Sequence, residues 1–228
     1  MKRNLLALAL AAVALTSGCG DGGGPGNGEG RVRFVHISPD AGPVDIVLDG
    51  DTVARSLSYA AASEYLDASA QGHTLQVSAA GTATTLLDQD LTVADGQDYT
   101  VLVADTLAHL QTIVLTDDNG SPPAGKVKVR AVHGSPHAGA VDVYVTTPND
   151  VLSGSTPVLT NVQFGQLSTY LDADAGSYRV RVTTHGSTDV LIDSGDLTLL
   201  TGQVRTVIAI DAEGGGDAFD FLVLPDRD

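Results

Sequence analysis

From residue 31 onward, hydrophobic and polar side chains alternate with a period of two. Gly, Pro, Asn, Asp or Ser interrupt this alternation about every ten residues, which is typical of short β-strands joined by turns. No stretch of ten or more residues shows the sustained 3.6-residue period of an amphipathic helix. The pattern therefore predicts an all-β fold.

The expected strands divide into two sets. The first set is 31–36, 44–48, 58–65, 73–79, 84–91, 99–104 and 110–115, and the second is 126–133, 141–145, 158–164, 169–171, 178–184, 190–197, 205–210 and 220–224. About seven short strands in about a hundred residues are typical of an immunoglobulin-like or transthyretin-like β-sandwich. A true antibody-type domain is excluded, because the chain has one Cys and no Trp.

The two sets are copies of one unit. Residues 32–46 and 129–143 are identical at 10 of 15 positions without a gap, and the Tyr-Leu-Asp-Ala of 65–68 recurs at 170–173. A period of about a hundred residues is too long for a solenoid repeat. We therefore predict two tandem sandwiches, 31–116 and 126–228, joined by a polar linker at 117–125.

The first residues are predicted to form a targeting signal. Lys2 and Arg3 precede an apolar run at 5–15, which is too short to span a bilayer but fits the core of a signal peptide. The run ends before Cys19, and the segment resembles a bacterial lipoprotein signal. That resemblance implies a signal peptide at 1–18, a lipidated Cys19, a flexible Gly-rich tether at 19–30 and, from Gly20, the outer membrane. The alternative is an ordinary secretory signal cut after Ala14, which leaves Cys19 as a free thiol.

Composition supports the β prediction and narrows the partners. The chain has 25 Asp but 3 Glu, and Asp favours turns over helices. The formal net charge of −16 argues against a nucleic-acid partner, which a basic face would have to bind. The single Cys excludes internal disulfides and Cys-rich zinc sites. We expect no cofactor, a membrane contact through the N-terminal lipid, and other envelope or surface proteins as partners.

Two His and two Asp recur at the same spacing and are the candidate site residues. His36 precedes Asp45 by nine residues, and His133 precedes Asp142 by nine. Strand alternation places both His on an inward face, so an antiparallel return could join each His to its Asp. The favoured interpretation is a structural hydrogen bond that fixes the first hairpin. The alternative is a His-Asp dyad that serves a base or a metal, as in a hydrolase.

Signals for other chemistry are weaker. Ser38 and Ser135 each precede a Pro in a turn, and no Gly-x-Ser-x-Gly elbow is present. Closely spaced aspartates such as Asp49 and Asp51 could bind calcium, but the EF-hand pattern is missing, so solvated turns are the favoured interpretation. We therefore expect no metal site and no catalytic residue.

The repeated segment Arg-x-Val-His-x-Ser-Pro-x-Ala-Gly-x-Val-Asp resembles the start of the bacterial domain of unknown function 4397. The resemblance covers nearly all of residues 31–225. It implies an extracytoplasmic β-rich module, often in tandem on secreted or lipid-anchored proteins, and it implies no catalytic residues. We predict a lipid-anchored envelope protein with a structural or interaction role, and a ligand- or calcium-binding module with acidic loops is the alternative.

Overall fold

The computed structural model describes residues 28–227. The expected signal peptide, Cys19 and most of the tether lie outside the described residues. The first half forms β1 (Glu29–His36), β2 (Val44–Leu48), β3 (Asp51–Leu57), β4 (Leu66–Ser69), β5 (Gly72–Ala79), β6 (Thr85–Thr92), β7 (Asp98–Ala104), the 3-10 turn η1 (Leu107–His109) and β8 (Gln111–Asp117). The second half forms β9 (Lys126–His133), β10 (Val141–Thr146), β11 (Leu159–Val162), β12 (Leu171–Asp174), β13 (Gly176–Thr184), β14 (Val190–Asp193), β15 (Leu197–Leu199), β16 (Val204–Asp211) and β17 (Phe219–Arg227).

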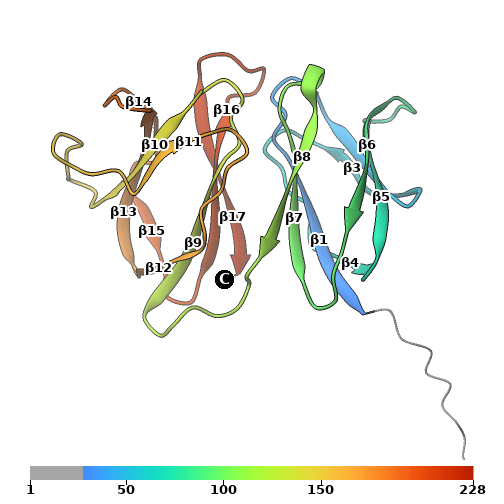
Figure 1. Ribbon diagram of the computed structural model, residues 1–228, viewed down its shortest axis with the longest axis horizontal. Helices are drawn as coiled ribbons and strands as arrows, with labels where there is room; N and C mark the ends of the chain where they lie inside the picture. The colour runs from blue at the N-terminus through green and yellow to red at the C-terminus, as the bar shows by residue number, and fades with distance from the viewer. Residues whose placement is uncertain (1–27, 228) are drawn as a thin grey trace, which may run out of the picture.

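The strands make two sandwiches of the same topology. Sheets β4-β1-β7-β8 and β3-β2-β5-β6 form the first, and sheets β12-β9-β16-β17 and β11-β10-β13-β14, with β15 also paired to β13, form the second. Within each sandwich the first strand runs parallel to a late one, β1 to β7 and β9 to β16. The four sheets stack as four layers (Figure 1). The predicted all-β sandwich fold is confirmed.

The strand predicted at 58–65 is wrong. This segment instead runs beside β1 as irregular chain, with the N–H of Ala60 and the N–H of Ser63 bonded to the carbonyls of His36 and Phe34. Ala60 has a φ of +57°, which breaks the extended conformation. The edge strands β3 and β4 lie on either side of it in sequence, and their polar, half-exposed residues gave little alternation.

The core of the first sandwich follows the predicted alternation. Val32 and Phe34 of β1 meet Val44 and Ile46 of β2 between the two sheets, and all four are fully buried. The intervening residues of β1 do not face water, although alternation alone assigns them to the solvent side. Arg33 and Val35 are buried as well, because a second sandwich covers that face of the sheet.

A separate apolar core therefore lies between the two sandwiches. Val35 and Leu102 of the first sandwich pack in one cluster with Val132 and Ile208 of the second. The inner sheets, β4-β1-β7-β8 and β12-β9-β16-β17, face each other across this cluster (Figure 1). The two copies share buried apolar surface, which stabilises their mutual arrangement.

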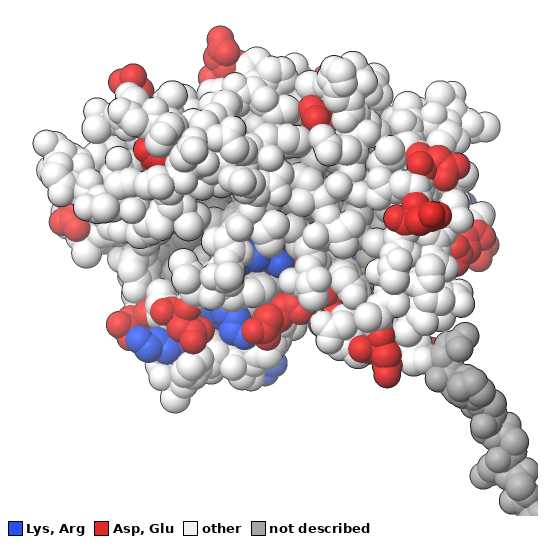
Figure 2. All heavy atoms as spheres, viewed as in Figure 1, with Lys and Arg blue, Asp and Glu red and all other residues white. Residues whose placement is uncertain are grey.

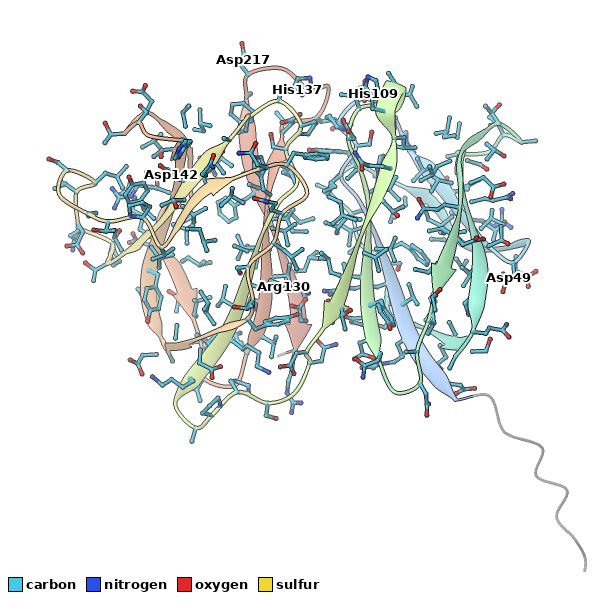
Figure 3. All side chains as sticks on the ribbon, viewed as in Figure 1. Asp49, His109, Arg130, His137, Asp142 and Asp217 are labelled. Atoms are coloured by element: carbon cyan, nitrogen blue, oxygen red, sulfur yellow. The ribbon has the colours of Figure 1, made fainter. Side chains whose placement is uncertain are left out.

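Two reciprocal ion pairs complete the interface at one end. Arg33 of the first sandwich pairs with Asp226 of the second, and Arg130 of the second pairs with Asp117 of the first, the latter at 2.6 Å. All four side chains are at most 4% exposed. Figure 3 shows Arg130 between the two inner sheets. Since the arginines hold equivalent positions in the repeats, the interface has pseudo-twofold symmetry.

Neighbouring side chains satisfy the buried charges. The guanidinium of Arg33 lies 4.7 Å from the ring centre of Tyr65, and that of Arg130 lies 4.6 Å from the ring centre of Tyr170. Each carboxylate also accepts hydrogen bonds from a threonine and a tyrosine of its own sandwich, Thr100 and Tyr65 for Asp117, and Thr206 and Tyr170 for Asp226. Asp117, the first residue of the predicted polar linker, is thus the buried last residue of β8.

Candidate functional site

The repeated histidines are buried at the ends of β1 and β9. His36 Nε2 lies 2.7 Å from the carbonyl oxygen of Gly42, and His133 Nε2 lies 2.7 Å from that of Gly139. In both rings Nδ1 faces a backbone N–H two residues further on, at 3.4 Å. Burial lowers the pKa of both imidazoles. The contacts fit a neutral ring that donates from Nε2 and accepts at Nδ1.

The expected hydrogen bonds from His36 to Asp45 and from His133 to Asp142 are wrong. Val44 and Ile46 point into the core, so the residue between them points out of the opposite face of its sheet, away from the inward His36. The aspartates instead accept backbone N–H groups, from Ser56 and Gly81 for Asp45, and from Asn161 and Gly186 for Asp142. Asp142 also contacts His185 Nδ1 at 2.8 Å. Each carboxylate therefore ties down loops beside its own strand.

Several of the closely spaced aspartates have protein partners. Asp49 accepts hydrogen bonds from the Thr74 N–H and from His73, and these bonds lower the pKa of Asp49. Three aspartates from other closely spaced pairs also contact a cation or an amide, Asp88 with Gln76, Asp174 with Lys126 and Asp193 with Arg179. Within residues 28–227 no group of three or more His, Cys, Asp or Glu side chains is placed to hold a metal ion.

At one Ser-Pro turn a serine and a histidine both contact the carboxylate at the end of β16. Asp211 accepts a hydrogen bond from the hydroxyl of Ser135 and lies 2.5 Å from His137 Nδ1. The bond to Asp211 raises the pKa of His137. Because the carboxylate stands between the hydroxyl and the imidazole, this order differs from a triad, in which the histidine contacts the serine. The first copy does not repeat the arrangement, since Ser38 Oγ is buried without a partner among the described residues.

The second sandwich contains an apolar cavity. A space of about 410 Å³ lies between its two sheets. Its lining includes Ala131 of β9, Val143 of β10, Val180 of β13, Ile192 of β14 and Ala209 of β16. In the part of the chain that the structure describes, the core of the first sandwich has twelve buried hydrophobic residues and the corresponding cluster of the second has three, so the second is underfilled.

Smaller side chains in the second copy explain the cavity. Phe34 pairs with Val101 in the first copy, and the equivalent register pair of the second is Ala131 with Val207. Val103 is likewise replaced by Ala209. Two more equivalent positions lose a carbon, Ile46 to Val143 and Leu75 to Val180, as the pairing of β2 with β5 and of β10 with β13 shows.

The cavity opens at the side where β11 and β12 form the sheet edges. Val145, Val158 and Leu171 belong to its lining and are also 41%, 49% and 50% exposed. Figure 2 shows a recess on this face of the second sandwich, with few charged atoms around its upper part. A continuous apolar surface thus leads from the solvent to the interior. This is the arrangement of a small-molecule site, since such pockets are concave, mostly apolar and about 300–1,000 Å³ in size.

The candidate site residues named from sequence do not line this cavity, although His133 borders a smaller space beside it. The sequence nevertheless indicates the cavity. Phe34 of the first copy aligns with Ala131 of the second copy, inside the segment in which 10 of 15 positions are identical. A loss of size at an inward position leaves a void unless a neighbour compensates. Sequence alone cannot show compensation, because the strand that would supply it lies across the sandwich.

Comparison with known families finds one match. The family described as a domain of unknown function, DUF4397, matches residues 30–144 and 145–228. The division between the two matched segments falls inside β10, whereas strand pairing places β9 and β10 in the second sandwich. A comparison with curated proteins finds no match.

Among solved structures, the chain is similar to three bacterial proteins at low scores. A streptococcal virulence factor described as binding alpha-glucan is 11% identical, with 84% of this chain and 96% of that chain covered and a TM-score of 0.28. A family 26 carbohydrate-binding module from Eubacterium rectale, in complex with maltoheptaose, is 8% identical, with 88% and 98% covered and a TM-score of 0.26. The Bacillus anthracis TIE protein is 10% identical, with 79% and 33% covered and a TM-score of 0.26.

Proposed function

The chain belongs to the DUF4397 family, and we propose that it is a non-catalytic, lipid-anchored protein of the cell envelope that takes up an apolar ligand in its second sandwich. The observation that carries the proposal is the open cavity of about 410 Å³ between the sheets of that sandwich. The first sandwich acts as the rigid support on which the binding sandwich is mounted.

An apolar void of this size calls for an explanation. Protein interiors are packed to the density of organic crystals, and each buried void lowers stability because its lining loses contacts. Engineered apolar cavities of about 150 Å³ remain dry and bind benzene. A cavity more than twice as large, with an exposed apolar rim, is therefore suited to an apolar ligand.

The binding role is favoured over catalysis by the state of the polar groups. His36 and His133 each bond a backbone carbonyl in the protein interior. The carboxylate of Asp211 accepts the hydrogen bond of the Ser135 hydroxyl and also contacts the ring of His137, so both groups are already engaged. A nucleophile needs an adjacent base that a third group orients. None of the described groups above is arranged in that way.

The anchor rests on the N-terminal sequence. Among the described residues there is no helix long and apolar enough to cross a bilayer. The basic Lys2 and Arg3, the apolar run at 5–15 and Cys19 before a Gly-rich segment favour attachment by lipid. The outer membrane is the proposed location.

The anchor is tested by Cys19→Ala. This variant should move from the membrane fraction to the soluble fraction, because its only cysteine is lost. Cys19→Ser serves as a second variant that also lacks the thiol. Membrane fractionation that is unchanged in both variants would refute the anchor.

The binding role is tested with the soluble chain that Cys19→Ala provides. A neutral fluorescent probe, N-phenyl-1-naphthylamine, should gain intensity on titration with this chain. Ala131→Phe restores the residue that fills the first sandwich, so it should abolish the gain. Val190→Phe adds similar bulk at an exposed residue outside the lining and should leave it intact. If the probe gains as much intensity with the Ala131→Phe chain as with the chain whose cavity is unaltered, the probe binds elsewhere.

A further inference from the structure

We propose that the ligand of the cavity is a single aliphatic chain with a neutral or cationic head group, of the length found in membrane lipids. This inference rests on the proposed binding function and adds the chemical class of the ligand. Three features of the cavity carry it: its shape, the absence of cations from its lining, and the position of its few polar groups.

The shape is that of a slot. The lining follows β13 from Tyr178 to Val182, and four steps of ~3.3 Å in a strand give a length of about 13 Å. Two packed sheets stand about 10 Å apart, so the space between them is narrow once side chains are added. Half of a hydrocarbon core of ~30 Å is about 15 Å, the depth that one lipid tail occupies. The slot therefore matches one tail in length.

The charge of the lining selects against an anion. None of the twenty lining residues is Lys, Arg or His, and one of them, Asp172, is acidic. The chain as a whole has a formal net charge of −16. The lining offers no cation to pair with a carboxylate, and the negative charge of Asp172 repels one. A fatty acid anion would thus bind poorly, whereas an alcohol or an ester is not repelled and an ammonium group is attracted to Asp172.

The polar groups lie on one side of the cavity. Asp172 belongs to β12, Ser168 precedes β12, and the hydroxyl of Tyr178 donates to the carbonyl of Asp174 on the same strand. Ser168 is already engaged, because its hydroxyl bonds the backbone at Ala131 and Thr169. Asp172 is exposed at this edge, close in sequence to the exposed Leu171 of the rim. The head group is therefore expected at β12 and the tail along β13.

The test is displacement of N-phenyl-1-naphthylamine by an alkan-1-ol series from hexanol to tetradecanol, each kept below its limit of solubility in water. Each added CH₂ should tighten displacement by about fourfold until the slot is full, after which the gain ends. Dodecanoate should displace at least about tenfold more weakly than dodecanol, and dodecylamine at least as well as dodecanol. Asp172→Asn should bring the displacement affinities of dodecanoate and dodecylamine closer together, since it removes the carboxylate at the mouth of the cavity.

Cavity-filling variants locate the effect. Ala131→Phe should remove displacement and binding together, and circular dichroism checks that it folds. Val180→Leu introduces the residue that the first copy has at the equivalent position, Leu75, and is a milder change. It should shorten the alkanol chain length at which the gain in affinity ends. Probe binding without displacement by any alkanol would overturn the aliphatic ligand and leave the binding function standing. No probe binding by the chain with an unaltered cavity would overturn both, and displacement that ignores chain length or favours dodecanoate would overturn the ligand class.

Discussion

Removal of one carboxylate from the reciprocal ion pairs should destabilise the whole chain. In Asp117→Ala the guanidinium of Arg130 loses the partner that lies 2.6 Å away. Arg130 is 1% exposed, so water cannot replace that partner. Thr100 and Tyr65 lose an acceptor at the same time. The perturbation thus leaves one buried charge and two hydroxyl donors without their present partner.

The magnitude follows from the burial of the pair. Breaking a buried ion pair by removing one partner costs about 3–5 kcal/mol, because the remaining charge stays in a medium of low dielectric constant. For 150–250 residues each kcal/mol lowers Tm by about 2–4 °C, so a loss of about 6–20 °C is expected. The bond from Arg130 to the carbonyl of Thr116 remains and places the result toward the lower end of this range.

The assay is thermal unfolding followed by circular dichroism, with the next residue in the sequence as the matched control. Asp118 pairs with Lys128 at 2.7 Å but is 61% exposed, so Asp118→Ala should cost no more than about 1 kcal/mol. The double variant Asp117→Leu with Arg130→Met should recover part of the lost Tm, because it removes the unpaired buried charge while Thr100 and Tyr65 still lack their acceptor. A Tm for Asp117→Ala within 2 °C of that for Asp118→Ala would refute the reasoning.

Two further predictions concern the interface and the histidines. Gly134→Ala should lower the free energy of unfolding by about 1–3 kcal/mol in chemical denaturation, because its Cβ would lie 2.6 Å from Ile37 Cδ1. The control Gly72→Ala places its Cβ in open space and should be neutral or slightly stabilising. Equal effects of the two variants would contradict the packing described. Burial lowers the pKa of His36 and His133 while the bond to Asp211 raises that of His137, so an NMR titration should find the first two below ~6.5 and His137 above it. The unfolded chain then binds protons at its His36 and His133 positions before the folded one does, so their contribution to stability is present above pH ~6.5 and is lost as the pH falls toward the folded pKa values; the contribution of His137 has the opposite sign and is lost as the pH rises through its folded pKa.

Much of the architecture was predictable because strand alternation is a local property. The positions of β1, β5, β7 and β9 follow from it within a residue or two at most ends. The edge strand β3 was missed because its half-exposed residues do not alternate clearly. Alternation gives no reason to bury the face of β1 that carries Arg33 and Val35, since a single sandwich would leave that face to solvent.

For the candidate site too, the sequence shows local features, whereas contacts between residues far apart in the chain appear only in the structure. The recurrence of His36 and His133 was visible, but their partners, the carbonyls of Gly42 and Gly139, carry no side-chain signal. The cavity depends on several residues that are far apart in the sequence and that all lose size together. Only the assembled sheets reveal that Ala131 has no larger neighbour to compensate for it.

The pseudo-twofold interface has the form of a homodimer contact made within one polypeptide. Each half supplies the same arginine to the other half's carboxylate, as in an isologous interface, where one patch serves both partners. Fusion raises the effective concentration of the two halves, so their pairing no longer depends on how much protein the cell makes. It also lets the halves diverge separately, which a homodimer with identical subunits cannot do. The first half keeps a full core and holds the assembly together, while the second can lose side chains from its own core and still find its partner.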